Sequence, residues 1–274
     1  MTRQLRPSPT CLNCGHAVTT RFCPDCGQEN TTYRVSLGSL VGDLFEELFQ
    51  LESRLWRTLW TMLRRPGLLT VEYNAGRRVA YTAPLRLYLV ASVAYFFVGS
   101  VMPHKDTREA KFDVPDISDV ERAKIDQKAP LLAPFIARVA EAHKDPKGTA
   151  ARVQRTIVDY APKIAAGLVP LLAIWTWILF RRPKRFFVEH LIFALHAHAT
   201  AFALLTVSAL LPWWPVGTAV TIALPVLTFM AMRRVFGQSR LRTSWKFVLI
   251  GMGYSLALGV GIGAVALIGF LARG

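Results

Sequence analysis

Five long apolar stretches constrain what this chain can fold into more than any other feature. A helix needs roughly 17 to 25 apolar residues to cross about 30 Å of hydrocarbon, and each stretch meets that length. The stretches run near residues 84–102, 162–180, 186–211, 216–232 and 247–271. Inside a bilayer every backbone polar group must be satisfied within the protein, which favours helices. We therefore predict an all-α integral membrane protein with about five transmembrane helices.

Positive charge is concentrated on one side of the predicted spans. Residues 1–86 carry eleven bases and seven acids, and the loops at 181–185 and 233–246 carry four and five bases without an acid. Together these segments hold +13 of the net charge of +15. Cytoplasmic loops are enriched in Lys and Arg, so we expect a multi-pass protein with a cytoplasmic N-terminus and an extracytoplasmic C-terminus. Charge distributed in this way indicates topology, and nucleic acid is not expected as a partner.

Residues 103–160 form the insertion that we expect outside the cytoplasm. Their eleven bases and ten acids nearly balance, which suits a translocated segment. Apolar residues then recur at helical spacing, at Leu131, Leu132, Phe135, Ile136 and Val139. This pattern predicts a short amphipathic helix that serves as a packing element or spacer.

All four cysteines lie in two C-x2-C turns near the N-terminus. The turns read Cys11-Leu-Asn-Cys14-Gly and Cys23-Pro-Asp-Cys26-Gly. Two such turns can direct four thiolates at one tetrahedral metal ion, and glycine after the second cysteine permits the positive φ that turns backbone amides toward the sulfurs. Thiols stay reduced in the cytoplasm, which disfavours two disulfides. The spacing predicts a zinc ribbon within residues 1–34, with His16 outside the completed set of ligands.

A complete set of four thiolates limits what such a metal can do. No position is left for water or substrate, so the zinc would be structural. A segment this short buries too little apolar area to fold alone, and metal binding supplies the missing free energy. Ribbons of this kind hold a partner protein, a nucleic acid or a neighbouring domain. Because basic and aromatic residues are sparse here, we expect a protein partner.

Residues 35–83 form the second predicted domain, a cytoplasmic amphipathic or interfacial helical segment. From Ser36 to Met62 apolar residues recur every three or four positions, and Trp56 and Trp60 widen that stripe. Pro66-Gly67 is expected to end the helix. A helix with Trp and Arg beside a first span lies in the interface plane or packs under the bundle. A partner-binding helix is the alternative.

Two further strings stand out beside the cysteine turns. Before the first span the chain reads Glu72-Tyr73-Asn-Ala-Gly76-Arg77-Arg78, followed by Tyr81 and Arg86. The third span contains Glu189-His190-Leu-Ile-Phe193-Ala-Leu-His196-Ala-His198. With the cysteine turns, these strings resemble an uncharacterised family of bacterial membrane proteins, catalogued as a domain of unknown function. The resemblance implies a Cys-rich metal site and a multi-span domain in the bacterial inner (cytoplasmic) membrane, but no known activity.

The resemblance also marks a candidate motif where the chain enters the membrane. Its residues are Glu72, Tyr73, Gly76, Arg77, Tyr81 and Arg86. We refer to the segment 72–86 that contains them as the E-Y-x-x-G-x-R motif, in which the last R of the pattern is Arg78.

The third span contains a candidate intramembrane functional site. Its members are Glu189, His190, His196 and His198. Ionisable groups are costly inside a membrane and are often functional. However, no pair has the i, i+4 spacing of a chelate, and the other spans contain no His, Cys or Asp, which disfavours a metal ion there.

Two interpretations of these histidines stay open. They either hydrogen-bond across helices as packing residues, or they serve a transporter of a small solute, a metal or protons. The hydrogen-bond partners available for packing are Tyr88, Tyr95, Thr176 and Thr200. Glu189 can instead pair with Arg185, four residues earlier.

The sequence contains no nucleophile elbow, phosphate loop or pair of catalytic carboxylates, so an enzyme is the least supported class. Gly259-x3-Gly263 in the last span permits close helix contact within the chain or with a second copy. We therefore expect a non-enzymatic scaffold or regulatory protein that docks a partner through its zinc ribbon. A five-span membrane domain at 84–274 completes the domain plan, and a transporter is the alternative function.

Overall fold

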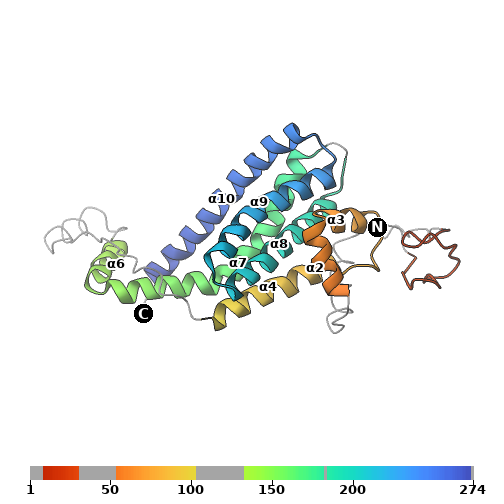
Figure 1. Ribbon diagram of the computed structural model, residues 1–274. Coiled ribbons are helices and arrows are strands. Elements are labelled where there is room, and N and C mark those ends of the chain that lie inside the picture. Colours follow the sequence, from red (N-terminus) through yellow and green to blue (C-terminus); the bar gives the residue numbers. More distant parts are fainter. Residues whose placement is uncertain (1–8, 31–53, 103–132, 182–183, 273–274) are drawn as a thin grey trace. The chain divides into compact units, whose positions relative to one another are not determined.

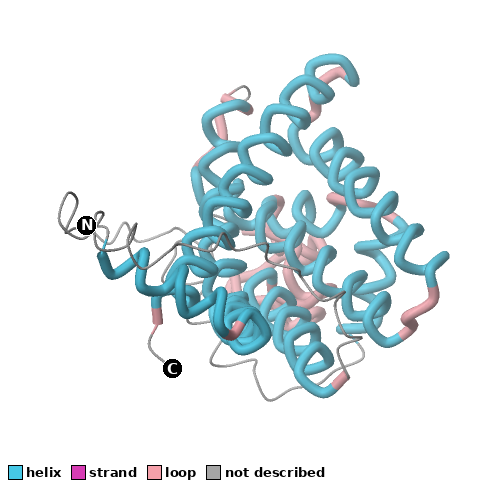
Figure 2. The backbone as a smooth tube through the Cα atoms, turned by 90° about the vertical axis from the view of Figure 1, so that its left-hand side faces the viewer, coloured by secondary structure: helices cyan, strands magenta, loops and turns pink. Residues whose placement is uncertain are grey.

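A computed structural model describes residues 9–30, 54–102, 133–181 and 184–272. Regular secondary structure within these residues is helical, as Figure 2 shows, apart from two isolated β-bridges near the cysteines. The helices, labelled in Figure 1, are α2 (Arg54–Arg64), α3 (Leu68–Asn74), α4 (Pro84–Val101), α6 (Ala133–Lys144), α7 (Pro146–Leu179), α8 (Phe187–Leu210), α9 (Trp214–Phe236) and α10 (Arg240–Leu271). The all-helical fold expected from the sequence is confirmed.

Five of these helices are long and apolar enough to cross a bilayer, namely α4, α7, α8, α9 and α10. By helix length and composition the chain is a multi-pass membrane protein in contact with lipid, as predicted. Two helices begin earlier than the apolar stretches that predicted them: α7 begins at Pro146 and not near residue 162, and α10 begins at Arg240 and not near residue 247. Proline suits the first turn of a helix, and Pro162, where the apolar stretch begins, lies inside α7 without ending it. The end of the predicted insertion is therefore part of a spanning helix.

The chain forms two compact units, and the first comprises Met1–Met102 and Val169–Met252. Of the five long helices, α8 is the most buried, and it packs most closely against α4. Aromatic rings fill this contact. Tyr88, Tyr95 and Phe96 of α4 surround Phe202 of α8 at centroid distances of 5.4 to 6.0 Å. The core of the first unit therefore runs along α8.

The α2–α3 segment packs against α8 and α9 within the first unit. The predicted helix ends before Pro66-Gly67, as expected, and its part at 36–53 lies outside the described residues. The sequence did not predict α3. Gly67 has φ +79°, and a Cβ there would lie 2.8 Å from the carbonyl oxygen of Ala231. The Arg234 guanidinium donates to the carbonyl of Pro66 at 2.6 Å. Glycine thus allows the turn between α2 and α3 to approach the backbone of α9.

The second unit comprises Pro103–Leu168 and Gly253–Gly274. It contains α6, which is the short helix predicted in the insertion, where Phe135 contacts Phe270 at 5.8 Å between ring centroids. The helices α7 and α10 approach closely at Gly269. A Cβ at this position would lie only 2.8 Å from the hydroxyl of Thr156. At Gly259 and Gly263 a Cβ would meet no atom within 4 Å. Contact of this pair with a second copy stays a prediction, as does the three-domain plan.

These glycines provide a matched test of the helix packing. Gly269→Ala places a methyl group against Thr156 and within 3.1 Å of the Val153 Cα, so we expect it to destabilise the protein by about 1–3 kcal/mol, as overpacking does. Gly259→Ala meets no neighbour, and because alanine favours a helix over glycine it should leave stability unchanged or raise it by up to about 1 kcal/mol. Thermal unfolding of both variants in detergent micelles measures the difference. Equal midpoints would show that α7 and α10 do not meet at Gly269.

Candidate metal centre and its link to the membrane helices

The two cysteine turns have the same local structure. In each turn the amide of the first cysteine donates to the carbonyl of the residue five positions later, at 2.7 Å from Cys11 and 2.8 Å from Cys23. The glycine amide donates back to the carbonyl of that cysteine, at 2.8 Å from Gly15 and 2.9 Å from Gly27. Both glycines have positive φ, +80° and +71°. The chain therefore folds twice into a turn that presents two sulfurs on the same side.

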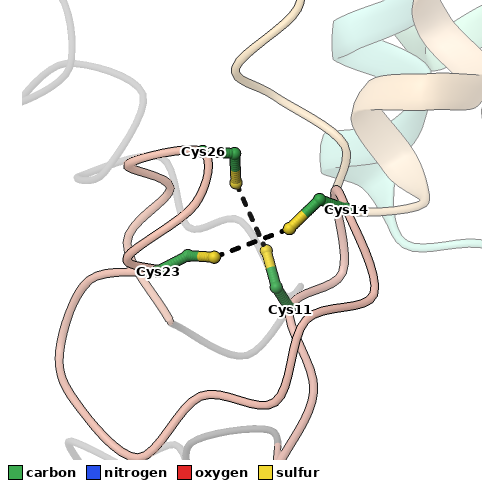
Figure 3. A group of neighbouring side chains, drawn as sticks. All are labelled: Cys11, Cys14, Cys23 and Cys26. Atoms are coloured by element: carbon green, nitrogen blue, oxygen red, sulfur yellow. Dashed lines mark hydrogen bonds between the residues drawn. The ribbon is translucent and has the colours of Figure 1, made fainter.

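The four sulfurs of these turns face one another, as Figure 3 shows. All lie within 4.8 Å of one another. The sulfur of Cys11 is 3.6 Å from that of Cys26, and the sulfur of Cys14 is 3.5 Å from that of Cys23. These distances exceed the roughly 2.05 Å of a disulfide, and they approach the edge of about 3.8 Å of a tetrahedron with 2.3 Å metal–sulfur bonds. The cysteines thus form a group that could hold a metal ion, as predicted.

The pKa values of Cys11 and Cys14 favour a cation among the sulfurs. Burial by itself raises the pKa of Cys11, but backbone amides of Cys14 and Asn13 that donate to its sulfur lower that pKa to about 7. The amide of His16 likewise acts to lower the pKa of Cys14, but burial and the neighbouring sulfurs raise it to about 12. Adjacent thiolates repel one another, and a divalent cation removes that penalty.

His16 lies outside the sulfur group. Its Nδ1 contacts a carboxylate oxygen of Asp25 at 2.7 Å, and both side chains are largely exposed. The contact joins one cysteine turn to the other, and the expectation that His16 is not a ligand stays a prediction.

Gln28 connects the second cysteine turn to the E-Y-x-x-G-x-R motif. Its side-chain Nε2 donates to the carbonyl of Gly76 at 2.9 Å, and its Oε1 accepts from the amide of Arg78 at 3.2 Å. We call these two bonds the Gln28 bridge. Gln28 also accepts the backbone bond from Cys23 that closes the cysteine turn. The residue that completes this turn is therefore the one that binds the segment leading into α4.

The E-Y-x-x-G-x-R motif folds into a compact turn at the end of α3. The guanidinium of Arg77 binds the carboxylate of Glu72 through both Nη2 (2.7 Å) and Nε, and the Arg77 amide donates to the Glu72 carbonyl at 3.0 Å. This contact lowers the pKa of Glu72 and raises that of Arg77. Gly76 has φ +85°, and its amide donates to the carbonyl of Tyr73. The ion pair thus closes the turn whose backbone the Gln28 bridge binds.

The remaining motif residues pack the turn onto the helices. Tyr73 is buried against Ile192 of α8, and the guanidinium of Arg78 lies 5.1 Å from the centroid of the Tyr73 ring. Tyr81 and Arg86 are half-buried, one before α4 and one in its first turn. The spacing of the motif identified these residues, but neither the ion pair nor the role of Gln28 could be inferred from it.

Glu189 lies in the first turn of α8, at the end of the span. Its carboxylate accepts from the amide of Phe186 at 2.7 Å and lies 3.5 Å from the guanidinium of Arg185. Glu189 therefore caps the helix and pairs with Arg185, as the alternative interpretation proposed.

The three histidines of α8 are buried and hydrogen-bond to three different elements. His190 Nδ1 lies 3.2 Å from the hydroxyl of Thr176 in α7, a partner that the sequence suggested. His196 Nδ1 lies 3.0 Å from the hydroxyl of Thr70 in α3, which the sequence did not suggest. His198 Nδ1 lies 2.9 Å from its own helix carbonyl at residue 194. Among the described residues the cysteines form a metal-ligand group and these histidines do not.

A small cavity lies beside His196 in the first unit. It is bounded by α8, α9 and the α2–α3 turn, with Thr70, Thr200 and Thr228 among its lining residues. The space open to the centre of a water molecule is ≈ 20 Å³, which holds about one water. A joint site of Glu189, His190, His196 and His198 stays a prediction.

Comparison with known proteins gives one match. Residues 52–96 match the model of a family described as "Protein of unknown function (DUF3667)". The matched segment contains α2, α3, the E-Y-x-x-G-x-R motif and most of α4. No curated protein and no solved structure matches the chain. The resemblance to a family of unknown function is thus confirmed, and the family assigns no activity.

The Glu72–Arg77 pair predicts a defined pH dependence of stability. Because the pKa of Glu72 is lowered in the folded protein, its contribution is present above the ordinary carboxyl pKa and is lost as the pH falls through the lowered value. We expect Glu72→Gln to lower the thermal midpoint at pH 7. In acid the midpoints of the variant and the wild type should converge.

Glu29→Gln provides the matched control, because Glu29 pairs with Arg21 at an exposed site, where ion pairs contribute little. Thermal melts of all three proteins from pH 7 downward make the comparison. If the thermal midpoint of the wild type stayed above that of Glu72→Gln by the same amount in acid, this role of Glu72 would be contradicted.

Proposed function

We propose that the protein is a non-enzymatic scaffold or regulatory protein of the bacterial inner membrane, which holds a partner protein on a structural zinc ribbon at the cytoplasmic face. The observation that carries the proposal is the group of four facing sulfurs. The Gln28 bridge binds the second cysteine turn to the segment that leads into α4. A metal-folded ribbon held in this way presents a defined surface.

The donor set suits zinc as a structural ion. Four thiolates are soft ligands that favour Zn²⁺ in tetrahedral geometry. Because all four positions are occupied by protein, the ion has none left for a substrate. The zinc would therefore stabilise the folded ribbon and take no part in a reaction.

The exposed side chains of the ribbon suit a protein partner. Phe22 and Leu12 are exposed, and the guanidinium of Arg21 lies 5.4 Å from the centroid of the Phe22 ring. Aromatic and arginine side chains contribute most strongly to binding at protein interfaces. Since Gln28 is already engaged by the E-Y-x-x-G-x-R motif, we assign partner binding to the surface around Phe22.

Contacts at one end of the first unit support the cytoplasmic orientation of the ribbon. Arg185, before α8, donates to the carbonyl of Val235 at the end of α9 at 2.7 Å. Arg234 donates to Pro66 in the α2–α3 turn. Both basic loops thus lie at the same end of their helices as the segment that the Gln28 bridge binds. Loops rich in arginine favour the cytoplasmic side.

The geometry gives the transporter alternative less support. The cavity at His196 has room for about one water, and each histidine of α8 already hydrogen-bonds to a neighbouring helix or to its own backbone. Buried polar residues in such bonds are typical of helix packing in membranes. We therefore assign the histidines to packing.

Metal analysis and copurification test the scaffold proposal together. We expect about one zinc ion per purified chain, and loss of that zinc in Cys23→Ser because a tetrahedral set loses one thiolate. The cellular abundance of the protein, or the recovery of copurifying proteins, should fall with it. His16→Ala is the matched control and should keep its zinc, since His16 pairs with Asp25 and not with the metal.

Two results would count against the proposal. Zinc retained at full stoichiometry in Cys23→Ser would contradict the four-cysteine metal site. Zinc lost with abundance and every copurifying protein unchanged would keep the metal site but remove the scaffold function.

A further inference from the structure

Helix α2 lies where the first span begins. The hydroxyl of Thr58 accepts from the amide of Thr82 at 3.0 Å, two residues before α4 starts. Thr58 and Met62 are buried and form the face of α2 that packs on the bundle. This contact fixes α2 at the end of a transmembrane helix, which is the level of the lipid headgroups.

The opposite face of α2 is exposed and apolar. Trp56 is 77% exposed, Trp60 59% and Leu63 39%. At about 100° per residue these three positions fall within roughly 60° of arc. Thr58 and Met62 lie about 200° to 240° around the helix from Trp56. The helix therefore has two apolar faces, and the described residues of the bundle cover one of them.

Arginines flank the exposed tryptophans without any acidic residue in α2. Arg57 and Arg64 are exposed and lie about 80° to 100° around the helix from Trp56. The guanidinium of Arg64 lies 4.1 Å from the centroid of the Trp60 ring. The flank of the tryptophan face is thus cationic, and the pairing holds one arginine directly beside an indole.

We propose that this Trp–Arg face of α2, formed by Trp56, Arg57, Trp60, Leu63 and Arg64, binds the anionic phospholipids of the bilayer that surrounds α4. Indole rings favour the membrane interface, where they are partly in hydrocarbon and partly in water. Arginines near an anionic leaflet are attracted to its phosphates. The surface is continuous with a transmembrane helix, so lipid reaches it without any docking step.

The proposal does not depend on the zinc ribbon or on its partner. It uses the half of α2 that faces away from the bundle, and it identifies the occupant as a phospholipid with a net negative headgroup. A partner protein on this face would contradict it.

Photo-crosslinking in the full-length protein identifies the occupant directly. We would replace Trp56 by a benzophenone amino acid, irradiate native membranes and determine the mass of the adduct. We expect phospholipid adducts at position 56 and adducts within the chain at position 62, the buried control. Protein adducts at position 56, or no adduct there, would overturn the proposal.

Headgroup selectivity tests the role of the arginines. In vesicles of equal phosphatidylcholine and phosphatidylglycerol, we expect the adducts at position 56 to be enriched in phosphatidylglycerol by about fivefold for each arginine. Arg57→Gln with Arg64→Gln should abolish the enrichment. Arg240→Gln with Arg242→Gln, exposed arginines on α10, should preserve it. Equal labelling of the two lipids by the protein with unchanged arginines would overturn the assignment to anionic lipid.

A conservative variant guards against failure of the benzophenone proteins to fold. Trp56→Phe with Trp60→Phe keeps the face apolar, and the comparison uses quenching of tryptophan fluorescence by brominated phosphatidylglycerol. The difference in emission between the unsubstituted protein and this variant is the emission of Trp56 and Trp60, since the other five tryptophans are common to both. We expect brominated lipid to quench this difference, and a difference that stays unquenched would show that these indoles do not touch lipid and would overturn the proposal.

Discussion

A polar side chain inside an apolar helix bundle must find a hydrogen-bond partner, and the first unit is organised around that constraint. Leaving such a group unpaired costs about 1–3 kcal/mol. Helix α8 contains three buried histidines, and their Nδ1 atoms are bonded to Thr176 of α7, Thr70 of α3 and the backbone of α8 itself. Each bond across elements therefore sets the position of a neighbour. On the packing proposal, α3 is the element that depends most on such a bond, because it is only seven residues long.

From α3 the same kind of bond continues to the metal site. Thr70 is bonded to His196, and four residues after Thr70 the helix ends in the turn that Glu72 and Arg77 close. The backbone of that turn is bound by Gln28, which in turn accepts from the amide of Cys23. A series of hydrogen bonds thus links the candidate metal centre to the interior of α8. The packing of α3 therefore positions the cysteine turns. The partly exposed Glu72–Arg77 ion pair closes the turn that joins them to α3.

Features with a period or a fixed spacing could be predicted from the sequence, and single long-range pairs could not. The five spans follow from apolar length, and the sulfur group follows from two C-x2-C-G turns, because both depend on neighbours in the chain. By contrast, the Gln28 bridge joins residues about fifty positions apart, and the bond of His196 joins residues 126 positions apart. One glutamine or threonine has no pattern that marks its partner. The start of α7 could not be predicted either, because Pro162, at which the apolar stretch begins, lies inside the helix and does not end it.

The sizes of the free-energy contributions indicate what stabilises the ribbon. Its buried core consists of Cys11, Cys23 and Val18, with Cys26 packed against them, so it contains a single buried aliphatic side chain. The Gln28 bridge adds two hydrogen bonds, each with a net contribution of about 1 kcal/mol. Structural zinc contributes roughly 10–16 kcal/mol in small domains of this kind. On the proposal that zinc occupies the sulfur group, the metal would fold the turn that carries Gln28, and the bridge would orient a turn that is already folded. Without the metal the amide of Gln28 has no fixed position, so docking on the E-Y-x-x-G-x-R motif should be lost with the metal even though no bridge residue is a ligand.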